Sequence, residues 1–288
     1  MTRIAVLGSA NMDLVVTVDR APSLGETVTG SSFRTIPGGK GANQALAAAR
    51  AGGDVRFLGA VGGDPHGERI RVLLAEAGVD VSGLVAVTEP TGTAHIIVDA
   101  TGANSIVVVP DANGTVRSLS DAHRQAIADV DTLLMQLELP LSVVVEAAAF
   151  ARAQGVTTIL TPAPVLPLPV ELLDNVDLLV PNEHEAAALG PARHDLLTTL
   201  GEDGARYERP GAEPLTVPAF KVHAVDTTAA GDTFVGAFAV ARSESPDLSV
   251  ALRWASAAAA LSVQRFGASA SMPRREEIEV FLQENPPC

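Results

Sequence analysis

The chain has 288 residues, of which 47% are hydrophobic and 19% charged, so it can form a sizeable core and carries too little charge for a disordered protein. A net charge of −14 argues against a nucleic-acid or anionic-membrane partner, and aromatic residues, at 3%, are too few to stack bases. The single cysteine, Cys288, excludes a disulfide scaffold and a cysteine-based metal site. The chain starts with a strand pattern instead of a signal peptide and contains no apolar run long enough to span a membrane, so we expect a cytoplasmic protein.

The first half of the chain alternates strand and helix patterns. Helices are predicted over 43–51, 67–77 and 141–154, each followed by a glycine. Short apolar runs predict buried strands at 4–7, 55–58, 132–136, 156–160 and 176–180. This alternation is typical of βαβ units. We therefore expect a single α/β domain over 1–288, with a doubly wound, mostly parallel sheet and helices on both faces.

Two pairs of segments break this rhythm. The segments 14–18 and 26–36, and likewise 93–99 and 104–109, alternate apolar and polar residues. Alternation leaves one face wet, which is typical of antiparallel hairpins and not of buried parallel strands. These lid strands, near 14–36 and 93–109, are interpreted either as a small β-sheet lid over a site or as edge strands without a catalytic role.

The strongest local feature is the segment 225–234. Its small residues end at Gly231, where an apolar helix is predicted to begin, and the N–H groups and dipole of a helix N-terminus suit an anion. Asp232 falls in the first turn of that helix. Its carboxylate either only favours the helix dipole or deprotonates a hydroxyl that attacks phosphorus, and the spacing alone does not decide between them.

A second feature is the glycine-rich segment 37–44. Its three glycines allow a close backbone approach to a ligand, and Asn43 and Gln44 offer paired donors and acceptors for sugar hydroxyls, although a plain turn fits as well. It is not a Walker A loop, because Gly41 and not Ser or Thr follows Lys40. The chain also lacks the G-x-G-x-x-G pattern of dinucleotide-binding proteins.

Three shorter segments follow predicted strands. Asn11 and Asp13 follow the first strand, at the carboxyl end where α/β proteins place their sites. The segment 182–185 suits either a hydrated metal near phosphates or, more simply, a helix cap at Asn182. The segment 199–204 reads as a strand end and a turn.

Taken together and in this order, the segments resemble the ribokinase-like carbohydrate kinase family over almost the whole chain. The matching segments are 8–13, 37–44, 135–138, 182–185, 199–204 and 226–234. The resemblance implies an ATP-dependent transfer of a phosphoryl group to the primary hydroxyl of D-ribose, giving ribose 5-phosphate. Alternatives are the same chemistry on deoxyribose, fructose, a keto-deoxy sugar acid or a nucleoside. A non-catalytic sugar or nucleotide sensor is a remote alternative, against which the intact Gly231 and Asp232 argue.

The resemblance also implies a role for individual residues. It makes Asp232 the general base and forms an anion hole from the N–H groups of Ala229, Ala230 and Gly231. The implied sugar-binding residues are Asn11, Asp13, Gly39, Lys40, Asn43, Glu138 and Asp232. The implied nucleotide-binding residues are Asn182, Thr199, Gly201, Gly204, Gly231 and Ser256.

Two metal ions and a partner are implied in the same way. Asn182 and Glu185 would hold Mg²⁺ through water, next to the phosphates of ATP. A K⁺ site behind the anion hole would use side-chain and backbone oxygens of Asp226, Thr228, Ser262, Arg265, Gly267 and Ser271. The lids of two chains would pair to form a homodimer.

The chain departs from the family pattern between Asn182 and Thr199, where it is shorter by about one helix. We expect a short helix over 183–189, stopped by the Gly190-Pro191 pair, and a next strand over 195–200. The missing helix predicts abnormal exposure of Leu196, Leu197 and Leu200. It also predicts a nucleotide site that is looser than the sugar site.

Overall fold

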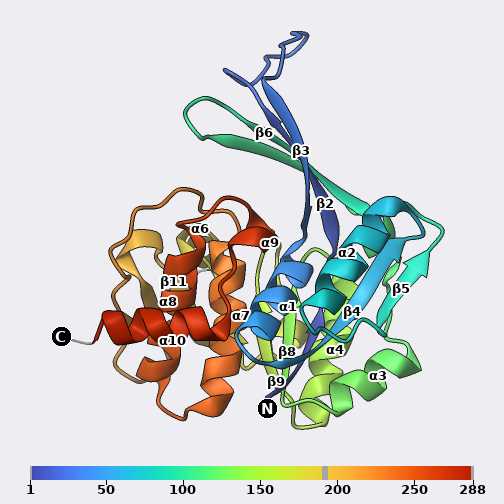
Figure 1. The fold of residues 1–288 in the computed structure, drawn as a ribbon. Coiled ribbons are helices and arrows are strands. Elements are labelled where there is room, and N and C mark those ends of the chain that lie inside the picture. Colours follow the sequence, from blue (N-terminus) through green and yellow to red (C-terminus); the bar gives the residue numbers. More distant parts are fainter. Residues whose placement is uncertain (1, 190–193, 287–288) are drawn as a thin grey trace.

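The computed structural model describes residues 2–189 and 194–286, so the predicted helix stop at Gly190-Pro191 and the terminal Cys288 lie outside the described residues. A large sheet flanked by helices forms the body, and a second, smaller sheet projects from it (Figure 1). Within the described residues, no helix is both long and apolar enough to cross a membrane.

The large sheet has the strand order β13-β12-β11-β10-β9-β8-β1-β4-β5. Its pairs are parallel from β5 to β11, while β12 and β13 add antiparallel strands at one edge. The strands are β1 (Arg3–Leu7), β4 (Asp54–Gly62), β5 (Leu84–Val87), β8 (Thr132–Gln136), β9 (Thr157–Thr161), β10 (Leu178–Leu179), β11 (Asp195–Thr199), β12 (Ala205–Glu208) and β13 (Leu215–Val217).

Helices cover both faces of this sheet, as the doubly wound prediction requires. The side chains of Ile4 and Val6 on β1 belong to one buried core and those of Ala5 and Leu7 to the other. The first core is covered by α1 (Lys40–Arg50), α2 (Pro65–Glu76), α7 (Ala230–Glu244), α8 (Leu248–Ser262) and α10 (Arg275–Glu284). The second is covered by α3 (Asp121–Ala128), α4 (Leu141–Ala153), α5 (Val170–Leu173) and α6 (Glu183–Leu189).

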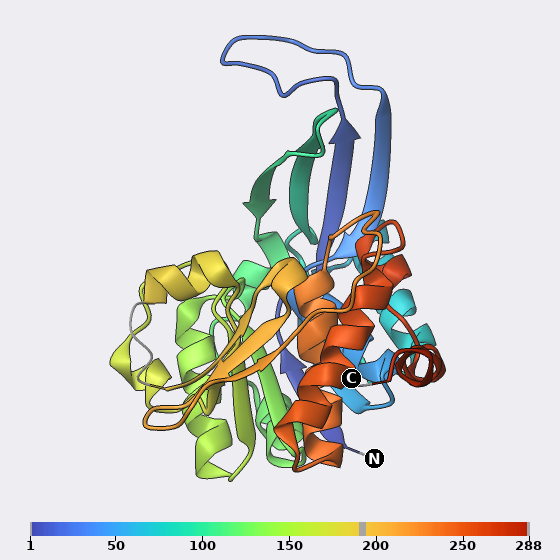
Figure 2. The same ribbon diagram turned by 90° about the vertical axis from the view of Figure 1, so that its left-hand side faces the viewer.

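The smaller sheet has the order β3-β2-β6-β7 and stands away from the body in both views (Figures 1 and 2). Both predicted hairpins are present, because β2 pairs antiparallel with β3 and β6 pairs antiparallel with β7. The strands are β2 (Asn11–Thr17), β3 (Ser32–Gly38), β6 (Gly92–Val98) and β7 (Asn104–Val109). The sheet is separate from the large one, so the alternative that these are only its edge strands is wrong.

The predicted exposure of the leucines on β11 is wrong for two of them. Leu196 is 7% exposed and Leu197 is 0% exposed, while Leu200 is half-buried. Leu197 belongs to the core that Leu252 of α8 joins, and Leu196 to the core that Leu172 of α5 joins. Both faces of β11 are therefore buried, one in each core, so these two leucines give no support to the expectation of a loose nucleotide site.

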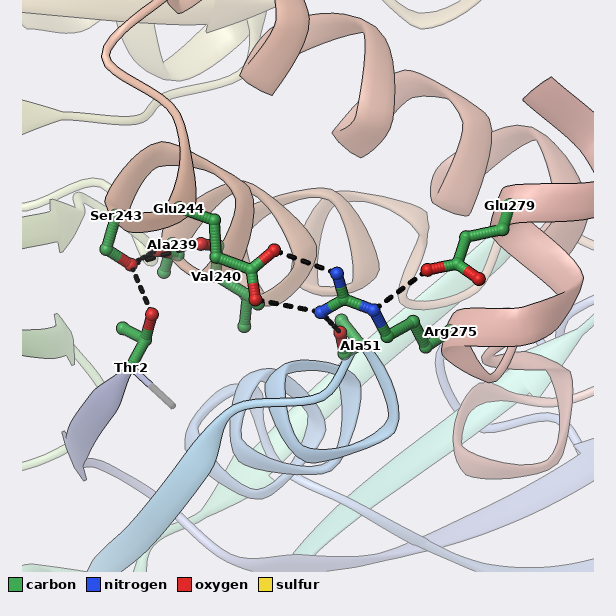
Figure 3. A network of polar contacts seen from close by, with 8 residues as sticks. All are labelled: Thr2, Ala51, Ala239, Val240, Ser243, Glu244, Arg275 and Glu279. Carbon is green, nitrogen blue, oxygen red and sulfur yellow. Dashed lines mark hydrogen bonds and ion pairs between the residues drawn. The ribbon is translucent and has the colours of Figure 1, made fainter. Parts of the chain in front are cut away.

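The far ends of three elements are tied together by a polar network around Arg275 (Figure 3). The guanidinium of Arg275 forms a two-pronged ion pair with Glu244, at N–O distances of 2.8 and 2.9 Å, and contacts Glu279 at 2.9 Å. It also donates to the carbonyl oxygen of Ala51, the C-cap of α1. Ser243 bonds Thr2 beside this network, so α1, α7 and β1 are fixed at the ends opposite to their polar loops.

Helices α1 and α7 approach each other closely at Gly236. A Cβ at this position would lie 2.6 Å from the carbonyl oxygen of Gln44 and 2.8 Å from the Cβ of Ala47, distances that real contacts do not show. Glycine here allows the backbones to touch, which sets the spacing between the two helices.

We expect Gly236→Ala to destabilise the protein. Alanine gains about 1 kcal/mol of helix propensity over glycine, but overpacking a well-filled contact costs about 1–3 kcal/mol, so the net change should be a loss of stability. Urea unfolding measures it, with Gly63→Ala as the control, because a Cβ there has its nearest neighbour at 3.9 Å. Equal stability of the two variants would show that α1 and α7 are not in close contact.

Candidate active site

The polar loops gather where the strand order of the large sheet reverses. From β1 the chain proceeds through β4 and β5 on one side and returns through β8 and β9 on the other. Ligands of open α/β sheets bind in the crevice outside the carboxyl ends of the strands at such a switch point. Asn11 and Asp13 follow β1 and Glu138 follows β8, so the topology brings these predicted site residues to one place.

Asp232 lies in the first turn of α7 and is 9% exposed. Its Oδ2 accepts a hydrogen bond from Nδ2 of Asn43 and its Oδ1 accepts one from Nε2 of Gln44, both at 3.1 Å. Burial raises the pKa of Asp232, while Lys40 and the two amides oppose that rise. The segments 37–44 and 225–234, which are far apart in the sequence, therefore meet at this carboxylate.

The carboxylate of Glu138 binds the N-terminus of α1. Its Oε2 accepts hydrogen bonds from the hydroxyl of Ser9 and, at 3.1 Å, from the backbone N–H of Lys40. Ser9 also accepts a bond from the N–H of Gly41 through its hydroxyl and one from Ala42 through its carbonyl oxygen. A carboxylate suits this position, because it faces the positive end of the helix dipole.

Asp13, Glu138 and Asp232 place three carboxyl groups around one lysine. Burial, and then repulsion from Glu138 and Asp232, raise the pKa of Asp13 to about 7. Burial disfavours the charge of Lys40, but Asp232 and Glu138 outweigh this effect and raise the pKa of Lys40. The site thus holds more acceptor charge than its own cation balances, which favours a ligand with several hydroxyl donors.

The turn before α7 has the geometry of an anion-binding site. Ala229 has φ 58° and ψ 17°, a left-handed conformation that costs a non-glycine residue about 1–2 kcal/mol. The backbone N–H and the hydroxyl of Thr233 hold it by donating to its carbonyl oxygen at 2.8 and 2.9 Å. The N–H of Ala230 donates to Thr227 at 3.2 Å, whereas in residues 2–189 and 194–286 those of Ala229 and Gly231 have no acceptor.

A cavity of about 200 Å³ opens next to this turn. It brings together residues from the glycine-rich segment, from the ends of β9 and β11, from the segment between β10 and α6, from α6 itself and from the start of α7. The lining residues are Lys40, Thr161, Val180, Asn182, Glu185, Thr199, Thr227, Ala229, Ala230, Gly231, Asp232 and Val235. Asp232 lines the cavity and also contacts Asn43, so it lies at the boundary between the cavity and the predicted sugar-binding residues.

Asn182 and Glu185 form a reciprocal cap at the start of α6. The N–H of Glu185 donates to Oδ1 of Asn182 at 2.8 Å, and the N–H of Asn182 donates to Oε2 of Glu185 at 2.9 Å. The simpler interpretation of Asn182 as a helix cap is therefore correct. Both residues also line the cavity, and Oε1 of Glu185 makes no hydrogen bond in the described part of the chain.

The remaining predicted nucleotide residues are spread more widely. Thr199 lines the cavity. Gly201 and Gly204 lie in the turn after β11 and do not line the cavity. Gly204 has φ 104°, and a Cβ there would lie 2.1 Å from the carbonyl oxygen of Val217, so only glycine fits. Ser256 lies buried on α8, outside the lining, and its hydroxyl has no partner within the described chain.

The residues predicted for a monovalent cation fall on two segments, 226–228 and 262–271, that Asp226 joins. Its Oδ1 accepts hydrogen bonds from the N–H and the hydroxyl of Thr228, at 2.9 and 2.6 Å, and its Oδ2 accepts one from the N–H of Gly267 at 2.8 Å. Burial opposes ionisation, but these bonds hold the pKa of Asp226 below its usual value. Ser262 accepts from the N–H of Arg265, whose side chain pairs elsewhere with Glu277.

Ser271 belongs to the short helix α9 (Ala268–Ser271), which follows Gly267. Its hydroxyl donates to the carbonyl oxygen of Ala268 at 2.8 Å. Arg50, at the end of α1, donates to the carbonyl oxygens of Ser269 and Met272, so α1 also supports this second loop.

Sequence reasoning missed several polar residues of the site. Ser9 stands within a recognised segment but received no role. Asn113 pairs with both backbone groups of Ala10 and donates to Oδ1 of Asn11 at 2.7 Å, and it lies in no motif. Gln136 donates to Gln44 at 2.7 Å and was hidden as the last residue of an apolar strand. A polar residue at the carboxyl end of a central strand was the one signal available for Gln136.

Comparison with known proteins identifies the family of the chain. Residues 1–275 match the pfkB family of carbohydrate kinases. The chain belongs to this family. The resemblance inferred from the motifs is thereby confirmed, and with it the activity of an ATP-dependent carbohydrate kinase.

Individual relatives are similar over nearly their full length. The chain is 46% identical to the ribokinase of Bacillus subtilis, over 98% of this chain and 100% of that protein. It is 40% identical to the ribokinase of Haemophilus influenzae, over 97% and 98%. The structure of Arabidopsis thaliana ribokinase complexed with ribose and ATP superimposes with a TM-score of 0.92 at 35% identity, over 98% of this chain and 99% of that one.

The raised pKa of Asp13 predicts a pH-dependent cost to the ligand-free protein. The carboxyl group of Asp13 binds its proton more tightly in the folded than in the unfolded state. The free energy of unfolding of the protein therefore falls as the pH rises from about 4 to about 7. Asp13→Asn should therefore increase the free energy of unfolding at pH 8, by up to about 4 kcal/mol, and much less at pH 4. Urea unfolding at both pH values measures the difference.

Asp19→Asn is the matched control, since Asp19 lies exposed just beyond the same strand. It should change stability equally at both pH values. A pH-independent effect of Asp13→Asn would contradict the prediction.

Proposed function

We propose that this carbohydrate kinase transfers the γ-phosphoryl group of ATP to the primary hydroxyl of D-ribose, giving ribose 5-phosphate and ADP. One observation carries the proposal: the buried carboxylate of Asp232 contacts Asn43 of the glycine-rich segment and also lines a cavity whose wall includes the turn at 229–231. The identity to ribokinases over the full chain supports ribose as the acceptor.

The sugar would bind on the side of Asp13, Asn43 and Glu138, with Asn11, Gly39 and Lys40 around it, and the triphosphate would lie in the cavity. Phosphoryl transfer needs alignment and charge stabilisation more than covalent help. As the sugar oxygen bonds to the γ-phosphorus and the bond to the oxygen of ADP breaks, Asp232 takes the hydroxyl proton. The N–H groups of the turn at 229–231 would take up charge on the phosphoryl oxygens.

Mg²⁺ fits the oxygen donors at the start of α6. It binds proteins through one or two carboxylates, keeps several waters and shares the phosphates of its nucleotide. Oε1 of Glu185 makes no hydrogen bond among the described residues and would accept one from such a water, and Asn182 lies beside it on the cavity wall. Bound there, the ion would neutralise charge on the phosphates.

K⁺ fits the oxygen-rich loops that Asp226 joins. The carboxylate of Asp226, together with oxygens of Thr228, Ser262, Arg265, Gly267 and Ser271, would hold the ion behind the anion-binding turn. Its contribution would be structural, because Asp226 and Thr228 lie within the three residues before Ala229 and their position would set where the N–H groups of the turn point.

The lid would pair with the lid of a second chain. The strand β7 is exposed along its whole length, and on β3 the side chain of Phe33 is 62% exposed. Val107 of β7, at 64%, lies on the same face of the sheet as Phe33 but on the opposite edge strand, and Ile106, at 52%, points to the other face. Patches of this kind mark protein interfaces in soluble proteins.

Turnover with ATP and a panel of acceptors tests the proposed function. Ribose should give the highest kcat/KM among ribose, deoxyribose, fructose, a keto-deoxy sugar acid and adenosine. A site that binds a substrate hydroxyl through a buried carboxylate discriminates against an analogue without that hydroxyl, so deoxyribose should be at least tenfold poorer. Absence of turnover with every acceptor would reject the proposal and favour a sensor.

Asp232→Asn should lower kcat by about 10²–10⁴-fold and leave the Kd for ribose within a few fold of the wild type. The amide cannot accept the hydroxyl proton, but it retains the size of the side chain. Steady-state kinetics and calorimetric ribose titration measure the two quantities. A near wild-type kcat would remove Asp232 from the role of base.

Replacing K⁺ by tetramethylammonium should lower kcat and the thermal unfolding temperature of the wild type. Asp226→Asn should abolish both responses. The control is Asp247→Asn at the N-cap of α8, since Asp247 binds the N–H and hydroxyl of Ser249 just as Asp226 binds Thr228. Identical unfolding temperatures of the wild type in the two salts would contradict a K⁺ site.

Light scattering at micromolar concentration should give the mass of a homodimer. Val107→Lys should convert it to a monomer, because a charge on the patch must be desolvated on pairing. Val250→Lys, at a 52% exposed position on α8, should leave the dimer intact. A monomeric wild type would rule out the pairing of lids.

A further inference from the structure

A chain of amide side chains runs from the centre of the large sheet to Asp232. Nε2 of Gln136, at the end of β8, donates to Oε1 of Gln44 at 2.7 Å. Nε2 of Gln44 donates in turn to Oδ1 of Asp232 and to the hydroxyl oxygen of Thr161, both at 3.1 Å. Gln44 and Gln136 are each 0% exposed.

The direction of this chain is dictated by Asp232. An ionised carboxylate only accepts hydrogen bonds, so Gln44 must turn its NH₂ group toward Asp232 and its oxygen toward Gln136. Gln136 must then also turn its NH₂ group toward Gln44. Its own Oε1 consequently faces the loop after β1, where it accepts no hydrogen bond from the described residues. A Cβ at position 8 would lie 2.1 Å from this oxygen, so only glycine fits there.

An unpartnered buried amide oxygen is unfavourable, and the opposite orientation would cost more. If Gln136 turned its oxygen toward Gln44, the amide of Gln44 would have to reverse and present its own oxygen to the carboxylate. Two acceptors would then face each other in a buried site without a proton between them. Gln136 therefore keeps Gln44 in the one orientation that suits an ionised Asp232.

We propose that Gln44 is a positioning residue for phosphoryl transfer, which holds the carboxylate of Asp232 ionised and in a fixed direction, and that Gln136 acts through Gln44 by fixing the orientation of its amide. This inference rests on the proposed function. Neither glutamine reaches the substrate, since both are fully buried behind Asp232.

Asn43 holds the other oxygen of Asp232 but differs from Gln44 in kind. It is assigned to the sugar, so its amide must serve a ligand as well as the base. Both hydrogens of the Gln44 amide are instead committed to protein groups, and its oxygen is committed to Gln136. Gln44 therefore supports the base in the free protein and in the complex alike.

Other charges around Asp232 act in both directions. Lys40 favours the ionised form, whereas Glu138 and Asp13 disfavour it, and burial disfavours it most. A hydrogen bond donated to the carboxylate counters that burial. Its removal should therefore shift the proton uptake of Asp232 toward neutral pH.

The test compares Gln44→Met and Gln136→Met with the wild type. Methionine retains volume and removes the hydrogen bonds. Gln44→Met should lower kcat at pH 7 by about tenfold or more and move the acid limb of the kcat profile up by about one to two pH units, with little change in the Kd for ribose. Gln136→Met should change both quantities in the same direction by less, because the amide of Gln44 remains.

Gln125→Met is the matched control, since Gln125 is exposed on α3. It should leave the rate and the profile unchanged. Gln136→Glu provides a rescue: a buried glutamic acid is neutral and donates its O–H to Gln44 as Gln136 does, so this variant should be closer to the wild type than Gln136→Met. It also keeps the proposal testable if Gln136→Met does not fold.

A second readout does not depend on turnover. ¹³C NMR of aspartate-labelled protein, with the Asp232 signal assigned from Asp232→Asn, measures the titration of this carboxyl group in the free protein. An upward shift in Gln44→Met supports the positioning role even if ribose is not the substrate, so failure of the proposed function and failure of this inference are distinguishable. Unchanged titration and an unchanged acid limb in Gln44→Met would overturn the inference.

Discussion

The contact between α1 and α7 is the constraint on which the site depends. The two helices begin side by side, and only a glycine at position 236 lets their backbones come close enough for Gln44 and Asn43 to reach Asp232. The contact brings one signature to the other and so creates a buried carboxylate with two amide donors. A separation larger by the width of a methyl group would lengthen both hydrogen bonds, which are already 3.1 Å long.

The same closeness makes the ligand-free site unfavourable. Asp13, Glu138 and Asp232 repel one another across a site that contains one lysine, and burial prevents water from screening them. Under the proposed function, hydroxyl groups of a sugar would supply the donors that these acceptors lack. A bound sugar would then relieve the repulsion, which would tie the stability of this region to substrate binding. Residues that are optimal for binding need not be optimal for folding.

Much of the fold and the centre of the site could be predicted from the sequence. The bounds predicted for β8 and β7 agree with the structure, because apolar runs and alternation report burial directly. The predicted roles at Asp232 rested on a helix start after small residues, a local feature that does not need the rest of the fold. In the structure that carboxylate does face the other signature.

The errors and omissions have a common cause, which is dependence on distant parts of the chain. Exposure of Leu196 and Leu197 was predicted from a missing neighbour in sequence, whereas each of them belongs to a buried core that many parts of the chain build. Asn113 and Gln136 act on residues about a hundred positions away, at Asn11 and Gln44. No local pattern distinguishes Asn113 from an ordinary polar residue, and for Gln136 only its place at the carboxyl end of a central strand does.

The two ends of α1 differ in what holds them, and this difference bears on how the smaller sheet could affect phosphoryl transfer. Arg275 holds the C-terminal ends of α1 and α7, through Ala51 and Glu244. The N-terminal ends of the same helices lie at the site. The lid has no comparable anchor at its tip (Figure 2). Its strand β3, however, leads within two residues into α1 through Gly39, whose φ of 90° turns the chain. The chain therefore passes from the smaller sheet directly to Lys40, whose N–H donates to Glu138 and which lines the cavity. If the smaller sheet closes over a sugar, as the proposed function implies, its movement would reach Lys40 first, while the two buried amides hold Asp232 in place.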